Sequence, residues 1–349
     1  MTARRILTQG HLNRALLARQ LLLERADLPH DRAIEQMAAL QDQNATALYV
    51  GLWSRVRGVE RAAVTAALED RTLIQGTLMR GTIHVVTRRQ YWLHAVAVRE
   101  PLREWFIRTR PAAERESTGQ AMLAHADRLR AALADGPRTV KELDGLASGF
   151  VGNAGLWVNL VRVPPSGTWE RRRADRLALA EDWVGPEQAG EVDGRALLVR
   201  SYLTAFGPAS WKDIASWAGV GVADLQRAAA EAGLALVIHE DESGKPLVDL
   251  PDAPLPDPDV PAPVRFLPHW DAITLVHARR TGVLPEPHRA ILYHIKNPAS
   301  MGTVLVDGRI VAGWRFRDGS IALEPFEEIA GPDHDAVEAE RAALEAFAA

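Results

Sequence analysis

The sequence of 349 residues is 47% hydrophobic and 25% charged, which is sufficient for two or three packed domains. It has no cysteine, so disulfides and thiolate metal sites are excluded, and its eleven histidines do not fall into a ligand spacing. No segment approaches the ~20 apolar residues of a membrane-spanning helix, and the first ten residues lack the apolar stretch of a signal peptide. We therefore expect a cytoplasmic protein with no metal, no cofactor and no membrane partner.

The net charge of −4 argues against a polyanionic partner, but the charge is unevenly distributed. Residues 231–260 and 324–349 each hold eight acidic side chains against a single basic one, so the rest of the chain is net basic by ten charges. Nearly all the cations are arginine, which suits bidentate phosphate contacts, although a GC-rich genome would also enrich arginine. The basic part of the chain is therefore compatible with nucleic acid.

In chain order, the first unit occupies roughly residues 1–100. Four segments carry apolar residues at helical spacing, two of them after a capping residue. They are residues 12–23, 31–40, 44–56 and 60–71. Residues 73–87 are β-branched and apolar with glycines at the bends, which predicts a β-hairpin. Helices followed by such a two-stranded wing predict a winged helix.

The same order recurs twice without detectable sequence identity. In the second unit, three helices and a strand–turn–strand wing are predicted. They cover residues 119–133, 140–147, 155–163 and 167–180. In the third unit, three helices precede a hairpin that turns at Ser243-Gly244, and Ser210 is suited to cap the second helix. These segments are residues 194–206, 211–219, 220–233 and 234–250.

A proline-rich stretch follows, with six prolines in residues 251–264, and predicts an extended spacer. Beyond it, residues 266–277, 302–316 and 320–329 alternate apolar and polar side chains, which predicts a small β-barrel or sheet before a final acidic helix. We therefore predict an α+β chain of three tandem winged-helix units with a C-terminal β-rich, barrel-like subdomain. The predicted boundaries are 1–100, 101–190, 191–250, the linker 251–264, and 265–349.

The residues that could carry chemistry are few. No phosphate loop, nucleophile elbow or pair of metal-binding carboxylates occurs. Gln41 and Gln43 flank Asp42 at the junction between two predicted helices. In an extended junction, residues two apart point to the same side, so two neutral amides could face one pocket. Glutamines at a helix start are also commonly solvated, and the spacing alone leaves both interpretations open.

Six segments together resemble the AlkZ-like family of winged-helix DNA glycosylases. They are LLARQLLLER (16–25), LQDQNATALYVGLWSRV (40–56), LIQGTLMRGTIHVV (73–86), FGPASWKDIASWAG (206–219), FLPHWDAITLVHARR (266–280) and GTVLVDGRIVAGWRF (302–316). The resemblance covers nearly the whole chain. It implies tandem winged helices around a DNA-binding concavity, with double-stranded DNA as the partner.

The family resemblance also implies catalytic residues. One branch carries Gln–X–Gln and the other Gln–X–Asp, so Gln41 and Gln43 are the implied catalytic pair of the branch associated with bulky or crosslinking N7-alkylguanine lesions. The middle position is usually apolar or small there, and Asp42 departs from that pattern. Whether Asp42 takes part, as a base that activates water, stays open at this point.

The chemistry of such a lesion suits two amides. A guanine alkylated at N7 is cationic, so it leaves as a neutral base with little need of a general acid. An amide carbonyl can accept a hydrogen bond from the attacking water and place partial negative charge near the sugar. Neither amide titrates, which predicts a nearly flat rate between about pH 6 and 9. Asp42 as the base would instead lower the rate on the acid side.

Further candidates are basic or aromatic. The predicted DNA contacts are Arg162, Arg171, Arg172, Arg173, Arg279, Arg280, Thr82 and His84. His269 and Trp270 are predicted to face the lesion, where the tryptophan could stack on a planar adduct. Structural alternatives exist for these candidates. The wing arginines could be solvated, His84 could be packed in the wing, and His269 and Trp270 could be buried in the β-rich subdomain. Four other tryptophans at apolar helical positions are predicted to be core, namely Trp53, Trp157, Trp211 and Trp217.

The leading interpretation is a monomeric, monofunctional DNA glycosylase for bulky N7-alkylguanine adducts made by a genotoxic natural product, acting near the nucleoid in self-resistance. One alternative is a non-catalytic winged-helix transcription regulator, but such regulators are usually symmetric dimers, unlike three dissimilar units in one chain. Another is a housekeeping glycosylase for small methylated purines, against which Gln43 argues because that branch has aspartate there.

Overall fold

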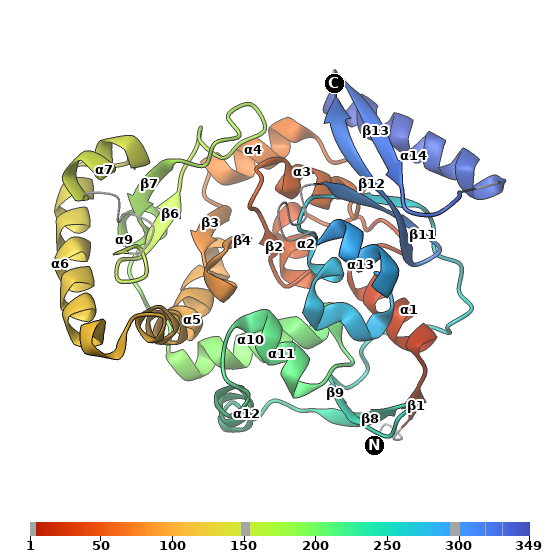
Figure 1. The fold of residues 1–349 in the computed structure, drawn as a ribbon, viewed down its shortest axis with the longest axis horizontal. Helices are drawn as coiled ribbons and strands as arrows, with labels where there is room; N and C mark the ends of the chain where they lie inside the picture. Colours follow the sequence, from red (N-terminus) through yellow and green to blue (C-terminus); the bar gives the residue numbers. More distant parts are fainter. Residues whose placement is uncertain (1–4, 148–153, 294–300, 318, 330) are drawn as a thin grey trace.

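Three β-sheets organise the chain, with helices packed around them (Figure 1). The computed structural model describes residues 5–147, 154–293, 301–317, 319–329 and 331–349. Within these ranges the strand orders are β2-β4-β3-β6-β7-β5, β10-β11-β12-β13 and β1-β8-β9. No helix in the described ranges has the length and hydropathy to cross a membrane. They also contain no group of three or more histidine, aspartate or glutamate side chains arranged to hold a metal ion.

The helices and hairpin predicted for the first unit are present. They are α1 (Gln9–Arg19), α2 (His30–Gln36), α3 (Thr46–Trp53), α4 (Arg61–Glu69), β3 (Leu73–Thr77) and β4 (Ile83–Thr87). Helix α2 ends earlier than predicted because Ala38 and Ala39 take positive φ angles of 60° and 75°, which are incompatible with a helix. The chain then enters the short strand β2 (Leu40–Gln41), which pairs with β4.

The six-stranded sheet joins the first and second predicted units, because β3 pairs with β6 (Leu160–Arg162). The prediction of a helix at 155–163 is therefore wrong. Its β-branched residues fill a strand position that β3 leaves open, and the Pro164-Pro165 pair prevents helix propagation beyond it. The wing consists of β6 and β7 (Arg176–Leu179), connected by residues 163–175.

The remaining elements of this region surround the sheet. They are α5 (Arg88–Arg108), η2 (Ala112–Glu114), α6 (Arg115–Leu133), β5 (Arg138–Thr139), α7 (Val140–Ala147) and α9 (Ala180–Trp183). The 21-residue helix α5 was not predicted from the sequence. Thr139 caps α7, since its hydroxyl accepts from the Glu142 amide at 3.3 Å.

The third predicted unit has the elements expected of it. They are α10 (Glu191–Phe206), α11 (Trp211–Ala218), α12 (Val222–Glu231), β8 (Val237–Asp241) and β9 (Pro246–Asp249). Ser210 caps α11 in a capping box with Asp213. The N-terminal strand β1 (Ile6–Leu7) adds in parallel to β8, a pairing between distant segments that local patterns cannot reveal.

The proline-rich stretch is extended but is fastened to α1 along its length. Arg19 Nε donates to the Pro254 carbonyl at 3.0 Å, and Arg14 Nε donates to the Val260 carbonyl at 2.6 Å. The stretch is therefore part of the folded structure and is not a free spacer.

The C-terminal strands form an open antiparallel sheet. They are β10 (Arg265–Leu267), β11 (Gly302–Val306), β12 (Arg309–Arg317) and β13 (Ser320–Pro325), followed by α14 (Pro332–Ala348). In the described residues β10 and β13 lie at opposite edges, so the predicted barrel is not formed. Only the first residues of 266–277 are a strand, because Pro268 cannot donate to a ladder and Asp271 caps a 3₁₀ turn. The segment continues as η3 (Ala272–Thr274), η4 (Val276–Thr281) and α13 (Glu286–Leu292).

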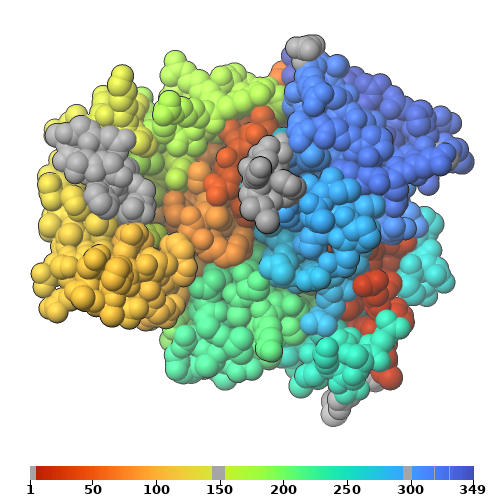
Figure 2. Space-filling view, in the orientation of Figure 1, coloured from red at the N-terminus to blue at the C-terminus, as the bar shows by residue number. Residues whose placement is uncertain are grey.

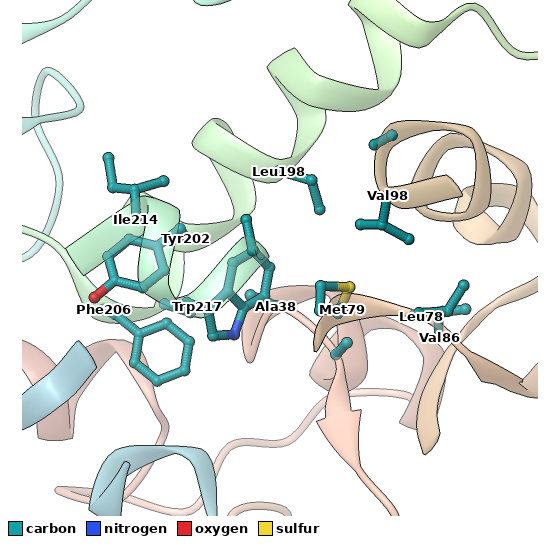
Figure 3. Packing of buried hydrophobic residues seen from close by; sticks show 14 of the residues in the cluster. Ala38, Leu78, Met79, Val86, Val98, Leu198, Tyr202, Phe206, Ile214 and Trp217 are labelled. Carbon is teal, nitrogen blue, oxygen red and sulfur yellow. The ribbon is translucent and has the colours of Figure 1, made fainter. Parts of the chain in front are cut away.

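One hydrophobic core connects the first and third units. Figure 3 shows Tyr202, Phe206 and Trp217 of α10 and α11 packed beside Met79 at the tip of the β3–β4 hairpin. Of the tryptophans predicted to be core, Trp217 and Trp157 are buried, while Trp53 and Trp211 are partly buried against core clusters. The tip of the first hairpin is thereby held against α11.

Candidate active site and DNA-facing residues

Gln41, Asp42 and Gln43 lie where β2 leaves the sheet. Gln41 pairs with His84 of β4, and the Asp42 amide donates to the Ile83 carbonyl at 2.8 Å. Just beyond, the Asn44 side chain accepts from the Thr46 amide at 3.1 Å and so starts α3. The segment is therefore fixed at both ends, by a strand on one side and a helix start on the other.

The two glutamines differ in environment. Gln41 is 7% exposed, and its Oε1 accepts a hydrogen bond from Arg80 Nη2 at 2.8 Å, whereas Gln43 is exposed. Burial lowers the pKa of Arg80 to about 10, so its guanidinium is still charged at neutral pH. Gln41 also lines a cavity of about 10 Å³ with Arg55 and Asp271, which is room for roughly one water molecule.

Asp42 points to the other face of the sheet. Its Oδ2 accepts from Gln75 Nε2 at 2.6 Å and its Oδ1 accepts from the Leu48 amide at 3.2 Å. The side chain is 2% exposed, and this burial raises the pKa of Asp42 to about 7, although the two hydrogen bonds and the Arg162 charge oppose the shift. Asp42 and Gln41 therefore lie on opposite faces of the sheet, while Gln43 lies in the bend that follows β2 and is exposed.

The arginines of the second wing lie on the connection 163–175. Arg171, Arg172 and Arg173 are exposed and line a pocket of about 320 Å³. Arg173 pairs with Asp175 at 2.9 Å, and the Arg172 guanidinium lies 5.4 Å from the centre of the Trp169 ring. Three cations on one exposed loop form a local positive surface suited to phosphate.

Arg162, which was also predicted to contact DNA, does not lie on this connection. It projects from β6 within the sheet, where its Nη1 donates to Thr77 Oγ1 at 3.1 Å and burial lowers its pKa. Its charge acts on Asp42. The structure thus gives Arg162 an interaction partner inside the protein.

His84, predicted either to contact DNA or to pack in the wing, is buried in β4. It is 2% exposed, because the alternation of β4 turns its ring inward, and its Nδ1 lies 3.0 Å from the Thr82 carbonyl. Burial lowers its pKa well below the usual value. Of the two interpretations, this burial favours a packed wing histidine, and the contact with DNA stays a prediction. Thr82 is partly exposed, with its hydroxyl bonded to the Met79 carbonyl at 3.1 Å.

Arg279 and Arg280 of η4 both have carboxylate partners. Arg279 pairs with Glu286 at 2.6 Å, while Arg280 pairs with Asp213 at 3.3 Å and with Asp241 at 2.9 Å. Arg280 therefore joins η4 to α11 and β8.

His269 and Trp270 follow β10 and are partly exposed. The Trp270 ring lies 6.3 Å from that of Tyr293, and the His269 ring lies 5.8 Å from that of Trp314.

Figure 2 shows residues of the first unit, in orange, in the middle of one face between the yellow α5–α6 region and the blue C-terminal sheet.

Two residues of this site were missed by the sequence analysis, namely Gln75 and Arg80. A signal existed for Gln75, because a glutamine inside an apolar strand requires a buried hydrogen-bond partner. Arg80 was less conspicuous. It occupies a turn with φ +57°, where an arginine is ordinarily solvated.

Comparisons with known proteins agree with this architecture. The family model described as DNA glycosylase AlkZ-like matches residues 34–347. Among solved structures, the chain is similar to Streptomyces sahachiroi DNA glycosylase AlkZ, with a TM-score of 0.74 and 17% identity over 98% of this chain and 97% of that one. No curated protein matches the chain. Because the family model covers nearly the whole sequence, this chain belongs to the AlkZ-like family of DNA glycosylases and has DNA as its partner.

Proposed function

We propose that this DNA glycosylase hydrolyses the N-glycosidic bond of N7-alkylguanine in double-stranded DNA, with Gln41 and Gln43 as its catalytic residues. The observation that carries the proposal is the inward orientation of Asp42, whose two oxygens are both occupied by N–H donors. The motif therefore offers the Gln41 amide on the face away from Asp42 and the exposed Gln43 amide in the bend that follows, and the carboxylate between them is bound to Leu48 and Gln75. Such a site suits a lesion that activates its own leaving group.

The proposed reaction balances without a protein acid. Water attacks C1′ as the C1′–N9 bond breaks, the bonding electrons neutralise the positive charge of the alkylated ring, and the proton of the water passes to solvent. The exposed Gln43 accepts a hydrogen bond from the attacking water. Gln41, oriented by Arg80, stabilises the oxocarbenium-like sugar with its oriented dipole.

The lesion class is part of the same proposal. Gln43 stands where the other branch of the family has aspartate, which supports bulky or crosslinking adducts from a genotoxic natural product over small methylated purines. The exposed Arg171–Arg173 loop would hold the phosphate backbone. We extend the proposal to a monomer that acts in the cytoplasm on nucleoid DNA as a self-resistance enzyme.

The proposal is tested by single-turnover release of base from a duplex with one N7-alkylguanine. Gln41→Ala combined with Gln43→Ala should lower the rate at least roughly 10²-fold, equivalent to ~2.7 kcal/mol of transition-state stabilisation. Affinity for DNA should change little, since phosphate contacts supply it. The matched control is Gln36→Ala on α2, which removes bonds to the Arg19 and Thr204 carbonyls and should leave the rate unchanged. Release at a wild-type rate by the double variant would contradict the assignment.

A further inference from the structure

Asp42 is an acidic side chain buried between β3 and the start of α3. It is 2% exposed, and each of its carboxylate oxygens accepts one N–H, from Leu48 at the start of α3 and from Gln75 on β3. An apolar residue would satisfy neither donor. A buried donor without an acceptor is destabilising, so the two donors favour a side chain at position 42 that accepts two hydrogen bonds.

The hydrogen bonds continue from Asp42 into the second wing. Gln75 Nε2 also donates to the Gly167 carbonyl at 3.0 Å. Gly167 has φ +75°, and a Cβ placed there would lie 2.7 Å from Gln75 Oε1, so the loop is closely applied to Gln75. Asp42 is therefore linked through Gln75 to the loop that carries Arg171–Arg173.

We propose that Asp42 is a positioning residue, whose ionised carboxylate holds the Gln41–Gln43 segment against Leu48 and Gln75 in the geometry needed for base release. The inference rests on the proposed function of the two glutamines. Asp42 does not touch the substrate in this proposal, because its carboxylate lies on the face of the sheet away from Gln41 and bonds the Leu48 amide and Gln75 Nε2. It acts through its neighbours in the chain.

The ionised form is required because both of its partners are donors. Protonation, or replacement by asparagine, would set a donor against the Gln75 or Leu48 N–H and break one bond. The titratable or charged groups that face Asp42 are Arg162 from β6 and Tyr49 from α3, with Glu170 acting on Tyr49 from the wing loop. Burial brings the pKa of Asp42 to about 7, which adds an acid-side decline to the flat profile that two amides alone predict.

The experiment compares wild type with Asp42→Asn and Gln75→Met by single-turnover base release between pH 5.5 and 8.5, together with the DNA dissociation constant. Wild type should rise to a plateau above about pH 7. Each variant should lower the plateau by about tenfold, and Asp42→Asn should abolish the acid-side decline. The dissociation constant should stay within about twofold. A variant that combines Asp42→Asn with Gln75→Met should lose no more of the plateau rate than the slower single variant, because both substitutions disrupt the same Asp42–Gln75 hydrogen bond.

Ser54→Ala is the matched control. Ser54 is fully buried and bonds the Val50 and Phe266 carbonyls, so its loss should weaken the fold without changing the rate or the pH profile. An Asp42→Asn variant with a wild-type rate and profile overturns the proposal. So does a large loss in Asp42→Asn beside an unaffected Gln75→Met, since Asp42 would then be the base itself. Wild-type protein that releases no base overturns the proposed function, and this inference with it.

Discussion

Arg80 Nη2 donates to Gln41 Oε1 over 2.8 Å, so the tip of the first hairpin sets the orientation of the Gln41 amide, the first of the two proposed catalytic groups. The same guanidinium donates through Nη1 to the Trp217 carbonyl in the last turn of α11. The approach is close, since a Cβ on Gly219 would lie 3.2 Å from the Arg80 amide nitrogen. Gln41 is thus oriented jointly by the first and third units, while Gln43 is exposed.

This relationship makes Arg80 the first target for mutation. Arg80→Met keeps most of the apolar stem and removes the donor to Gln41, so base release should fall by about tenfold in a single-turnover assay while DNA affinity changes little. Arg103→Met is the control, because Arg103 is another arginine whose pKa is lowered by burial and whose Nε donates to a carbonyl, that of Leu156. A wild-type rate in Arg80→Met would mean that Gln41 does not depend on this orientation.

Much of the third unit could be predicted because its local patterns agree with its tertiary structure. Ser210 and Asp213 form a capping box at the start of α11, and Gly219 ends the helix with φ 72°. The apolar residues between them face one core. Propensity, capping and packing all specify the same helix, so the sequence pattern was sufficient.

The second unit and the site show where local patterns are insufficient. Residues 155–163 form part of a sheet only because β3 offers an edge to β6, a pairing that depends on distant sequence. The side to which Asp42 points depends on the register of β2 on β4, and a shift of one residue would reverse it. The motif could be located from the sequence, but the inward position of Asp42 and the role of Arg80 required the folded structure.

The wing loop gives a second prediction. Replacing Arg171, Arg172 and Arg173 with alanine should weaken binding to damaged and undamaged duplex equally, because phosphate contacts carry no sequence information. The salt dependence of binding should flatten by a slope of ~0.9 for each arginine–phosphate interaction that the substitutions remove. Fluorescence anisotropy at several salt concentrations measures both effects. Arg227→Ala on α12, an exposed arginine paired with Asp224, is the control, and an unchanged slope in the triple variant would show that the loop does not contact DNA.

A third prediction concerns stability. The pKa of Asp42 is raised from 3.8 to about 7, so between these values the folded protein holds a proton that the unfolded chain has released. The free energy of unfolding therefore falls as pH rises through this window, by up to about 4 kcal/mol from this group. Asp42→Asn should remove this pH dependence, so its stability relative to wild type should increase from pH 5 to pH 8, in addition to a pH-independent cost of the hydrogen bond that the asparagine breaks.

Urea unfolding at pH 5 and pH 8 measures the effect. His84 and His277 have lowered pKa values and change stability in the opposite direction over part of this range, so the difference between wild type and variant at each pH isolates Asp42. A variant that is equally destabilised at both pH values would show that Asp42 is ionised at no energetic cost in the fold. Slower base release by a variant that this measurement shows to be folded at the assay pH could not be attributed to partial unfolding.

The last prediction concerns which bases the enzyme releases. Gln41 and Gln43 have no titratable proton, so they can neither protonate a leaving base nor deprotonate a poor nucleophile. Asp42 cannot take over that task, because both its oxygens are engaged away from the glutamines. The substrate must therefore supply its own activation, as the cationic N7-alkylguanine does. We expect release of N7-alkylguanine, and no release of uracil or O6-alkylguanine, whose bases start neutral.

Single-turnover release from three matched duplexes, each with one of these bases, measures the difference. The pH dependence on N7-alkylguanine separates the possible mechanisms further. A single acid-side decline near pH 7 agrees with the positioning role of Asp42, whereas a bell-shaped profile requires both an acid and a base. Efficient uracil release would likewise require a proton donor to the departing base. Either result would place the chemistry on side chains other than the two amides.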